Sequence, residues 1–107
     1  MMKIPDQPSE VHDAALILGN TLRLAILHVL SGGPMSRAEA SRRLKVSETN
    51  LSRQLTTLQD YGLVTSKTLP GRGRPLEYRA NQDRVELVLQ ALSSYVRGTG
   101  DETQPRR

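Results

Sequence analysis

The sequence contains no cysteine, phenylalanine or tryptophan, and tyrosine occurs only three times. Without cysteine the chain has no disulfide, no thiolate metal site and no thiol redox switch, so nothing indicates an oxidising compartment. With so few aromatic rings, the hydrophobic core must be built from leucine, isoleucine, valine and alanine. The 107 residues suffice for one domain, which we expect to bury about two-thirds of the surface that the unfolded chain exposes.

Long apolar runs are also missing. No stretch approaches the roughly 20 apolar residues of a transmembrane helix, and residues 1–9 lack the apolar segment of a signal peptide. We therefore predict a cytoplasmic protein that has no membrane partner.

Signatures of catalysis and of metal binding are absent as well. The sequence has no Ser-His-Asp or Cys-His set, no P-loop and no dinucleotide-binding fingerprint. His28 falls in an apolar segment without a neighbouring carboxylate. His12 lies beside Glu10 and Asp13, which we interpret as part of an ordinary helix surface, because zinc sites usually need three or four well-placed ligands. We predict no enzyme, no cofactor and no metal site.

Positive charge is concentrated in the middle of the chain. The formal net charge is +4, and residues 35–79 carry nine basic and four acidic side chains, whereas the two flanks are close to neutral. A basic segment of this kind favours a polyanionic partner, because each neutralised phosphate releases counterions. A solvated basic surface is the alternative that the charge alone leaves open.

Apolar spacing and capping residues predict four helices in the first 61 residues. The first spans residues 9–18, with Gly19 as its stop signal, and the second runs from a cap at Asn20 to about residue 31. Ser36, followed three residues later by a glutamate, resembles a capping box that opens a short third helix. A turn at residues 44–46 precedes a fourth helix over 47–61. The apolar stripe of the first helix consists of Val11, Ala14, Ala15 and Leu18.

After Gly62 the pattern changes from helical to alternating. It predicts strands over 63–69 and 76–80, joined by a tip at 70–75 that is rich in glycine and proline. Asn81 can cap a last helix over 82–97. We predict a flexible arm at residues 1–8, one domain at 9–97 and a disordered tail at 98–107. The fold class is thus mainly α with a small two-stranded β-hairpin, in the order of a winged helix-turn-helix.

The third and fourth predicted helices form a helix-turn-helix, whose second helix should enter the DNA major groove. Leu51, Leu55 and Leu58 share one face of that helix and must point to the core, which turns a short polar face outward. Arg53 suits the O6 and N7 atoms of guanine, and Asn50 suits adenine. An ordinary solvent-exposed face is the competing interpretation. The predicted DNA-binding residues are Ser36, Arg37, Ser47, Thr49, Asn50, Ser52, Arg53, Thr56, Thr57, Lys67, Arg72, Gly73 and Arg74.

Several ordered motifs resemble winged helix regulators of the arsenical-resistance-repressor (ArsR) type, over roughly residues 18–80. The motifs are Leu18-Gly19-Asn20 with Arg23-Leu24-Ala25-Ile26-Leu27, Val46-Ser47 with Leu51-Ser52-Arg53-Gln54-Leu55 and Leu58, and Tyr61-Gly62-Leu63-Val64 with Gly73-Arg74 and Tyr78. The resemblance implies a DNA-binding regulator that pairs through its terminal helices. Metal sensors of that family use cysteines, or histidines and carboxylates on the last helix, which this chain lacks. Lys45 also replaces a glycine that is frequent in the turn.

The predicted tip of the hairpin resembles the core of an AT-hook. Its residues 72–75 read Arg-Gly-Arg-Pro, and a thin tip of this kind can enter a narrow minor groove, where A·T tracts concentrate negative potential. A hairpin that touches only phosphates explains the arginines equally well.

The last helix is apolar on two sides. Its apolar arc covers about 200°, against roughly 100° for a helix that covers a single core. A homodimer accounts for the second side and would place two recognition helices about one DNA turn apart; the docking of a different protein is the alternative. The predicted dimerisation residues are Val11, Leu18, Val85, Val88, Leu89, Leu92, Tyr95 and Val96.

Together these features predict a dimeric, sequence-specific regulator of transcription, most simply a repressor, that binds double-stranded DNA in the nucleoid. Single-stranded RNA is disfavoured as a partner because the basic segment lacks stacking aromatic residues. The main alternative is a winged helix that binds proteins without DNA specificity. The sequence contains no pattern that identifies the operator, the controlled genes or an effector.

Overall fold

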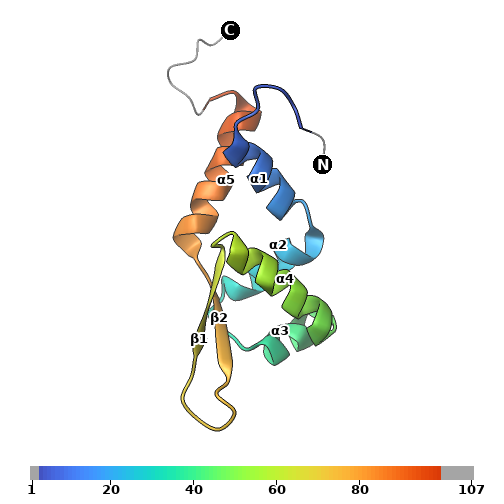
Figure 1. Ribbon diagram of the computed structural model, residues 1–107, viewed down its shortest axis with the longest axis vertical. Coiled ribbons are helices and arrows are strands. Elements are labelled where there is room, and N and C mark those ends of the chain that lie inside the picture. Colours follow the sequence, from blue (N-terminus) through green and yellow to red (C-terminus); the bar gives the residue numbers. More distant parts are fainter. Residues whose placement is uncertain (1–2, 100–107) are drawn as a thin grey trace.

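The computed structural model describes residues 3–99, which form five α-helices and one β-hairpin (Figure 1). In chain order these elements are α1 (Ser9–Leu18), α2 (Thr21–Leu30), α3 (Arg37–Leu44), α4 (Glu48–Asp60), β1 (Val64–Thr68), β2 (Leu76–Ala80) and α5 (Gln82–Arg97). The order confirms the predicted fold class, a mainly helical winged helix-turn-helix with a two-stranded hairpin between its last two helices.

Side-chain caps begin four of these helices at the residues that the sequence predicts. The caps accept backbone N–H bonds at Asn20 from Arg23 (2.9 Å), at Ser36 from Glu39 (3.1 Å), at Ser47 from Asn50 (3.1 Å) and at Asn81 from Arg84 (3.3 Å). Each bond satisfies an amide of the first turn that has no partner inside its helix. The starting points of α2 to α5 are therefore determined locally.

The core lies between the first four helices and the base of the hairpin. Its most deeply buried members are aliphatic, as predicted, and Tyr78 is the one aromatic residue among the buried side chains of the described chain. The core cluster comprises Ile17, Leu18, Ile26, Leu27, Leu30, Ala40, Leu51, Leu55, Leu58, Leu63, Val64 and Tyr78.

The buried face of α1 differs from the predicted stripe. Ile17 is almost completely buried, whereas the predicted Ala15 is only partly buried. The reason is that α1 packs against both α2 and α5, so its buried face turns toward Ile17. A stripe predicted for a helix that packs against one neighbour does not account for this rotation of the buried face.

The hairpin is antiparallel, with a register that runs from Val64 opposite Ala80 to Thr68 opposite Leu76. β1 is one residue shorter at each end than predicted. The N–H of Leu63 donates to the carbonyl of Leu58 (2.9 Å) and so completes the end of α4, and the N–H of Leu69 donates to Pro75 (2.8 Å) beyond the ladder. The tip projects away from the core (Figure 1).

At the opposite end of the molecule, α1 and α5 pack side by side (Figure 1). This arrangement makes the chain elongated, with principal extents of 59 × 24 × 19 Å. Gly98, the first residue of the predicted tail, ends α5 in the left-handed conformation, at φ 72°. Residues 100–107 of that tail and residues 1–2 of the predicted arm lie outside the described residues.

Candidate nucleic-acid interface

The helix-turn-helix consists of α3 and α4, which pack against each other and against α2. The turn between them passes through Lys45, whose φ of 59° and ψ of 43° are left-handed. Two contacts close this turn: the N–H of Lys45 donates to the carbonyl of Ser41 (2.8 Å), and the Ser41 hydroxyl donates to the carbonyl of Val46. The geometry at Lys45 is the one for which glycine is preferred, since a Cβ there costs about 1–2 kcal/mol.

The faces of α4 are those predicted from its periodicity. Its three leucines, at positions 51, 55 and 58, are buried in the core. The opposite face is polar: Thr49, Asn50, Arg53 and Thr56 are exposed, and Ser52 and Thr57 are partly exposed. The hydroxyls of Thr56 and Thr57 donate to carbonyls one turn back, at 3.1 and 3.2 Å. They therefore present methyl groups and oxygen acceptors outward.

Ion pairs divide the basic side chains of this region into two groups. Arg37 at the start of α3 pairs with Glu48 of α4 (3.2 Å), and Arg42 and Arg43 both pair with Glu39 (3.6 and 3.2 Å). The second group has no ion pair within residues 3–99. It consists of Lys45, Arg53, Lys67, Arg72 and Arg74. These side chains can meet phosphates or base edges without first losing an internal partner.

The tip of the hairpin is a narrow turn that contains residues with positive φ. Gly71 and Gly73 have positive φ, and so does Arg74, at 48°. The N–H of Arg74 donates to the carbonyl of Gly71 (3.2 Å), which closes a tight turn. Both tip arginines are exposed, and Gly73 between them carries no side chain, so the tip is thin.

Two contacts hold the hairpin against the helix-turn-helix, and the sequence pattern gives no signal for either. The backbones of Met35 and Tyr78 exchange two hydrogen bonds (3.0 and 2.8 Å), which tie the segment before α3 to β2. The Gln59 amide at the end of α4 donates to the Ser66 hydroxyl on β1 (3.1 Å). The hairpin and α4 therefore form one supported surface.

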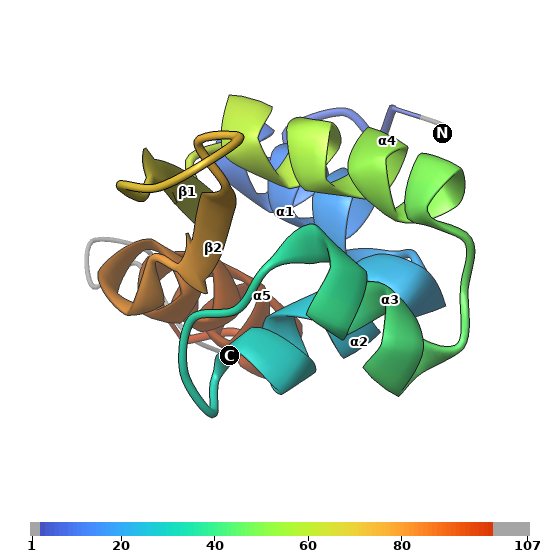
Figure 2. The same ribbon diagram turned by 90° about the horizontal axis from the view of Figure 1, so that it is seen from below.

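The predicted DNA-binding residues lie on α4, the start of α3 and the hairpin. Viewed from below, α3, α4 and the hairpin are on the near side of the molecule, with α1 and α5 behind them (Figure 2). The interface thus combines a polar helix face with an adjacent basic hairpin tip.

The predicted dimerisation residues divide into two sets. Val11 and Leu18 are buried inside the protomer, where they have little surface left for a partner. By contrast, α5 has no buried residue. Leu89 and Val96 leave 46% and 81% of their surface exposed, and Tyr95 is also exposed. Val85, Val88 and Leu92 are partly buried against the core.

The histidines behave as side chains of ordinary helices. His28 is exposed and His12 is partly exposed. Within residues 3–99, no three histidine, cysteine or acidic side chains gather into a group that could hold a metal ion. In the same part of the chain, no single helix has the length and apolarity to cross a membrane; α1 and α2 reach that threshold only as a pair bent by 85°.

A helix-turn-helix followed by a supported hairpin defines a winged helix-turn-helix, and residues 18–67 match the family described as a helix-turn-helix domain. No curated protein matches the sequence at a significant level. An ArsR-like transcriptional regulator from Rhodococcus sp. RHA1 is 27% identical, with a TM-score of 0.69 over 84% of this chain and 82% of that one.

Two further solved structures share the fold. The reduced form of the regulator YodB from B. subtilis is 24% identical, with a TM-score of 0.67 over 94% of this chain and 100% of that one. The homodimeric winged helix-turn-helix DNA-binding domain of Mb0332 from Mycobacterium bovis, a possible ArsR-family regulator, is 24% identical, with a TM-score of 0.64 over 100% and 99% of the two chains.

The chain therefore has a winged helix-turn-helix fold and is similar to DNA-binding transcriptional regulators. Its likeness to regulators of the ArsR type, predicted from the sequence motifs, is confirmed.

Proposed function

We propose that the protein is a dimeric repressor that reads the major groove of an operator with α4 and contacts the neighbouring minor groove or phosphates with the hairpin. One observation carries this proposal. The polar face of α4, which carries Arg53, lies beside a hairpin whose tip carries Arg72 and Arg74, while the apolar face of α4 is held in the core. None of these three arginines makes an ion pair within the described part of the chain.

The division of roles follows from the chemistry of these groups. A guanidinium on the exposed face of a helix can donate two hydrogen bonds to one guanine, which distinguishes base pairs. Cations at a thin hairpin tip reach the backbone or the narrow groove and strengthen binding at low salt. The Nε of Arg37 donates a hydrogen bond to Glu48 (3.2 Å), so we assign Arg37 an orienting role between α3 and α4.

The dimer is supported by the pattern of α5. Val85, Leu89, Leu92 and Val96 are spaced by four, three and four residues, which is the spacing of a helix-pairing seam. Leu89 and Val96 in that seam are exposed in the protomer. The homodimeric domain of Mb0332, which matches the whole chain in fold, offers a precedent. A second copy would cover this seam and set two α4 helices on one operator.

The repressor role is supported by a likeness in fold to the transcriptional repressor BigR from Xylella fastidiosa, which is 21% identical with a TM-score of 0.64. A regulator that acts on the chromosome would work in the nucleoid, so the predicted location remains part of the proposal.

The decisive experiment selects binding fragments from the source genome with the purified protein. Fluorescence anisotropy then compares the enriched duplex with a shuffled duplex of the same composition. A specific regulator should bind the selected duplex at least about a thousandfold more tightly, because base contacts add to the nonspecific phosphate term. Equal affinity for both duplexes would contradict the proposal and favour a protein-binding module. Transcription in vitro from the selected promoter should then fall as the protein is added.

A further inference from the structure

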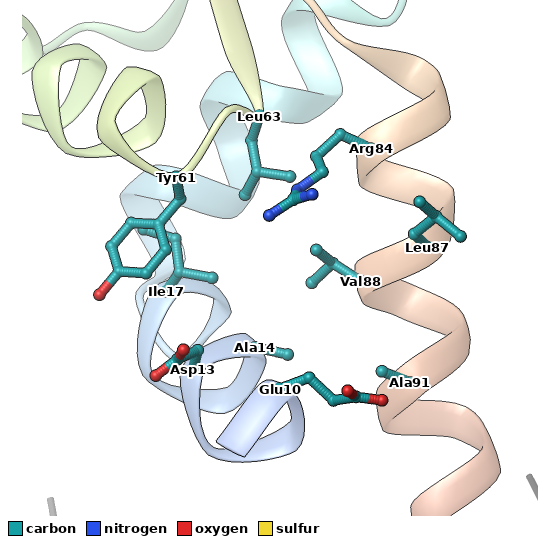
Figure 3. A pocket seen from close by; sticks show the side chains of 10 residues that line it. All are labelled: Glu10, Asp13, Ala14, Ile17, Tyr61, Leu63, Arg84, Leu87, Val88 and Ala91. Carbon is teal, nitrogen blue, oxygen red and sulfur yellow. The ribbon is translucent and has the colours of Figure 1, made fainter. Parts of the chain in front are cut away.

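A cavity of about 410 Å³ lies where α1, the end of α4 and α5 meet (Figure 3). Its volume is within the usual range of sites for small organic molecules, about 300–1,000 Å³. Its lining residues are Glu10, Asp13, Ala14, Ile17, Tyr61, Leu63, Arg84, Leu87, Val88 and Ala91. None of these residues belongs to the predicted DNA-binding set.

The middle of the cavity is apolar. Ile17 and Leu63 are almost completely buried and form its inner wall, and Val88 and Ala91 of α5 face them (Figure 3). Leu87 of α5 also lines the cavity and leaves 60% of its surface exposed. A bound molecule would therefore remove apolar surface of α5 from water, which favours binding by about 25 cal/mol per Å².

Opposite charges stand at the two ends of this apolar middle. The guanidinium of Arg84 points into the cavity next to Leu63, and Glu10 extends from α1 across to Ala91 at the far end (Figure 3). Asp13, a second carboxylate of α1 in the lining, points to the other side of that helix, away from Glu10 (Figure 3). Within the described residues, none of these three charged groups makes an ion pair or a side-chain hydrogen bond.

We propose that the cavity binds a small zwitterionic molecule with an apolar middle, whose carboxylate meets Arg84 and whose ammonium group meets Glu10. A simple anion would pair with the guanidinium but face the Glu10 carboxylate, and a simple cation would face the guanidinium. An uncharged apolar molecule would give neither Arg84 nor Glu10, which are both exposed, a charged partner. Only a molecule with separated opposite charges satisfies both ends.

The position of the cavity gives this site a regulatory role, an inference that rests on the proposed function. Tyr61 is the C-cap of α4 and Leu63 precedes β1, whereas Leu87, Val88 and Ala91 belong to α5. The molecule would thus lie between the recognition helix and the helix assigned to dimerisation. Two residues along a helix correspond to a turn of about 200°, so Leu87 in the cavity and Leu89 in the seam lie on different sides of α5. Val88, one of the predicted dimerisation residues, also lines the cavity, so the cavity borders the seam.

Isothermal titration calorimetry of the DNA-free protein tests the site by itself. The probe is ω-aminooctanoate, compared with octanoate and octylamine, which carry one charge each. We expect the zwitterion to bind about tenfold more tightly than either, since a charged hydrogen bond contributes roughly one tenfold step or more. Equal binding of octanoate, or no binding of the zwitterion, would overturn the proposal.

Three variants locate the binding. Arg84→Gln should weaken the zwitterion about tenfold, whereas Arg97→Gln, on the last turn of α5 outside the cavity, should leave it unchanged. Ala91→Leu should abolish binding by filling the cavity without changing any charge. Circular dichroism checks that each variant is folded, and the zwitterion should raise the melting temperature of the wild type only in proportion to its occupancy. A loss that is equal in the two arginine variants would place the molecule elsewhere.

A second measurement tests the regulation. Saturating zwitterion should weaken binding to the selected operator at least about fivefold, and the operator should weaken zwitterion binding by the same factor. Unchanged operator affinity would refute the regulatory role while leaving the binding site intact. If the protein binds no operator at all, the proposed function fails and the calorimetric result still decides the site.

Discussion

Arg23 joins the end of α1 to the middle of α4 through Gln54. Its Nη1 donates to Oε1 of Gln54 on α4 (2.8 Å). The same guanidinium donates from Nε to the carbonyl of Ile17 (2.8 Å) and from Nη2 to that of Leu16 (3.4 Å). These two carbonyls belong to the last turn of α1 and have no partner inside the helix. One side chain therefore sets the position of α1 relative to α4.

Arg23→Lys should lower the free energy of unfolding by about 1–2 kcal/mol, because a lysine ammonium cannot serve all three acceptors in the fixed geometry of a guanidinium. Chemical denaturation measures the loss. Arg97→Lys is the matched control, since Arg97 makes no ion pair within residues 3–99 and should tolerate the exchange. A double-mutant cycle with Gln54→Ala should give a coupling of about 0.5–1.5 kcal/mol, and a coupling near zero would show that the Gln54 bond contributes nothing.

Lys45→Gly should stabilise the protein by roughly 0.5–1 kcal/mol. The left-handed backbone at Lys45 costs about 1–2 kcal/mol with a Cβ, and the larger freedom of glycine in the unfolded chain offsets part of the gain. Lys45→Ala is the control, because it removes the charge and keeps the Cβ. Thermal unfolding should therefore rank Gly above Ala at this position. The opposite order would mean that the turn relaxes when the side chain is shortened.

Those parts of the fold that depend on local chemistry could be read from the sequence. Asn20, Ser36, Ser47 and Asn81 cap their helices because a side-chain oxygen needs only an amide two or three residues ahead. The faces of α4 follow from three leucines at helical spacing.

Other features depend on which elements meet in space, which a single sequence does not show. The burial of Ile17 requires α5 on the second side of α1, and the bridge of Met35 to Tyr78 joins residues that are far apart in the chain. The hydrogen bond from Arg23 to Gln54 joins residues 31 positions apart, and no periodic pattern in the sequence predicts it. The cavity near Arg84 arises in the same way, from α1, α5 and the segment between α4 and β1.

Val96→Glu should convert the proposed dimer to a monomer. Val96 is 81% exposed in the protomer, so a carboxylate there costs the isolated chain little but would be buried unpaired in a dimer seam. Leu92→Glu is less informative, because Leu92 also packs against the protomer core. Gln90→Glu places the same charge on a different face of α5 and should remain dimeric. Sedimentation velocity decides, and a wild-type monomer at micromolar concentration would reject the dimer.

Arg53→Ala should relax discrimination at particular base pairs by about 1–3 kcal/mol, because it removes hydrogen bonds to a base edge. The test measures affinity for the selected operator and for a set of single-base-pair variants of it. Arg97→Ala, distant from α4 on the end of α5, should leave every ratio unchanged. If the Arg53 variant weakens all duplexes by the same factor, Arg53 contacts phosphate, and the assigned register of α4 on the groove is wrong.

Replacing both Arg72 and Arg74 with alanine should weaken operator binding, because the tip carries two exposed cations without ion pairs in the described chain. If the tip enters the minor groove, the loss should be greatest where the flanking DNA is rich in A·T pairs, whose narrow groove strengthens the potential that guanidinium groups sense. If the tip meets only phosphates, the loss should be equal for all flanks, and the slope of log affinity against log salt should fall by about two.

A salt titration on operators with A·T-rich and G·C-rich flanks separates these two modes of contact. Arg79→Ala is the matched control from the same hairpin, because Arg79 is already paired with Glu77 (3.5 Å) and lies on β2, away from the tip. It should change the salt slope by less than one, since a paired cation releases few counterions when it approaches a phosphate. An unchanged affinity of the double variant on both operators would show that the hairpin supports α4 through Gln59 and Ser66 without touching DNA.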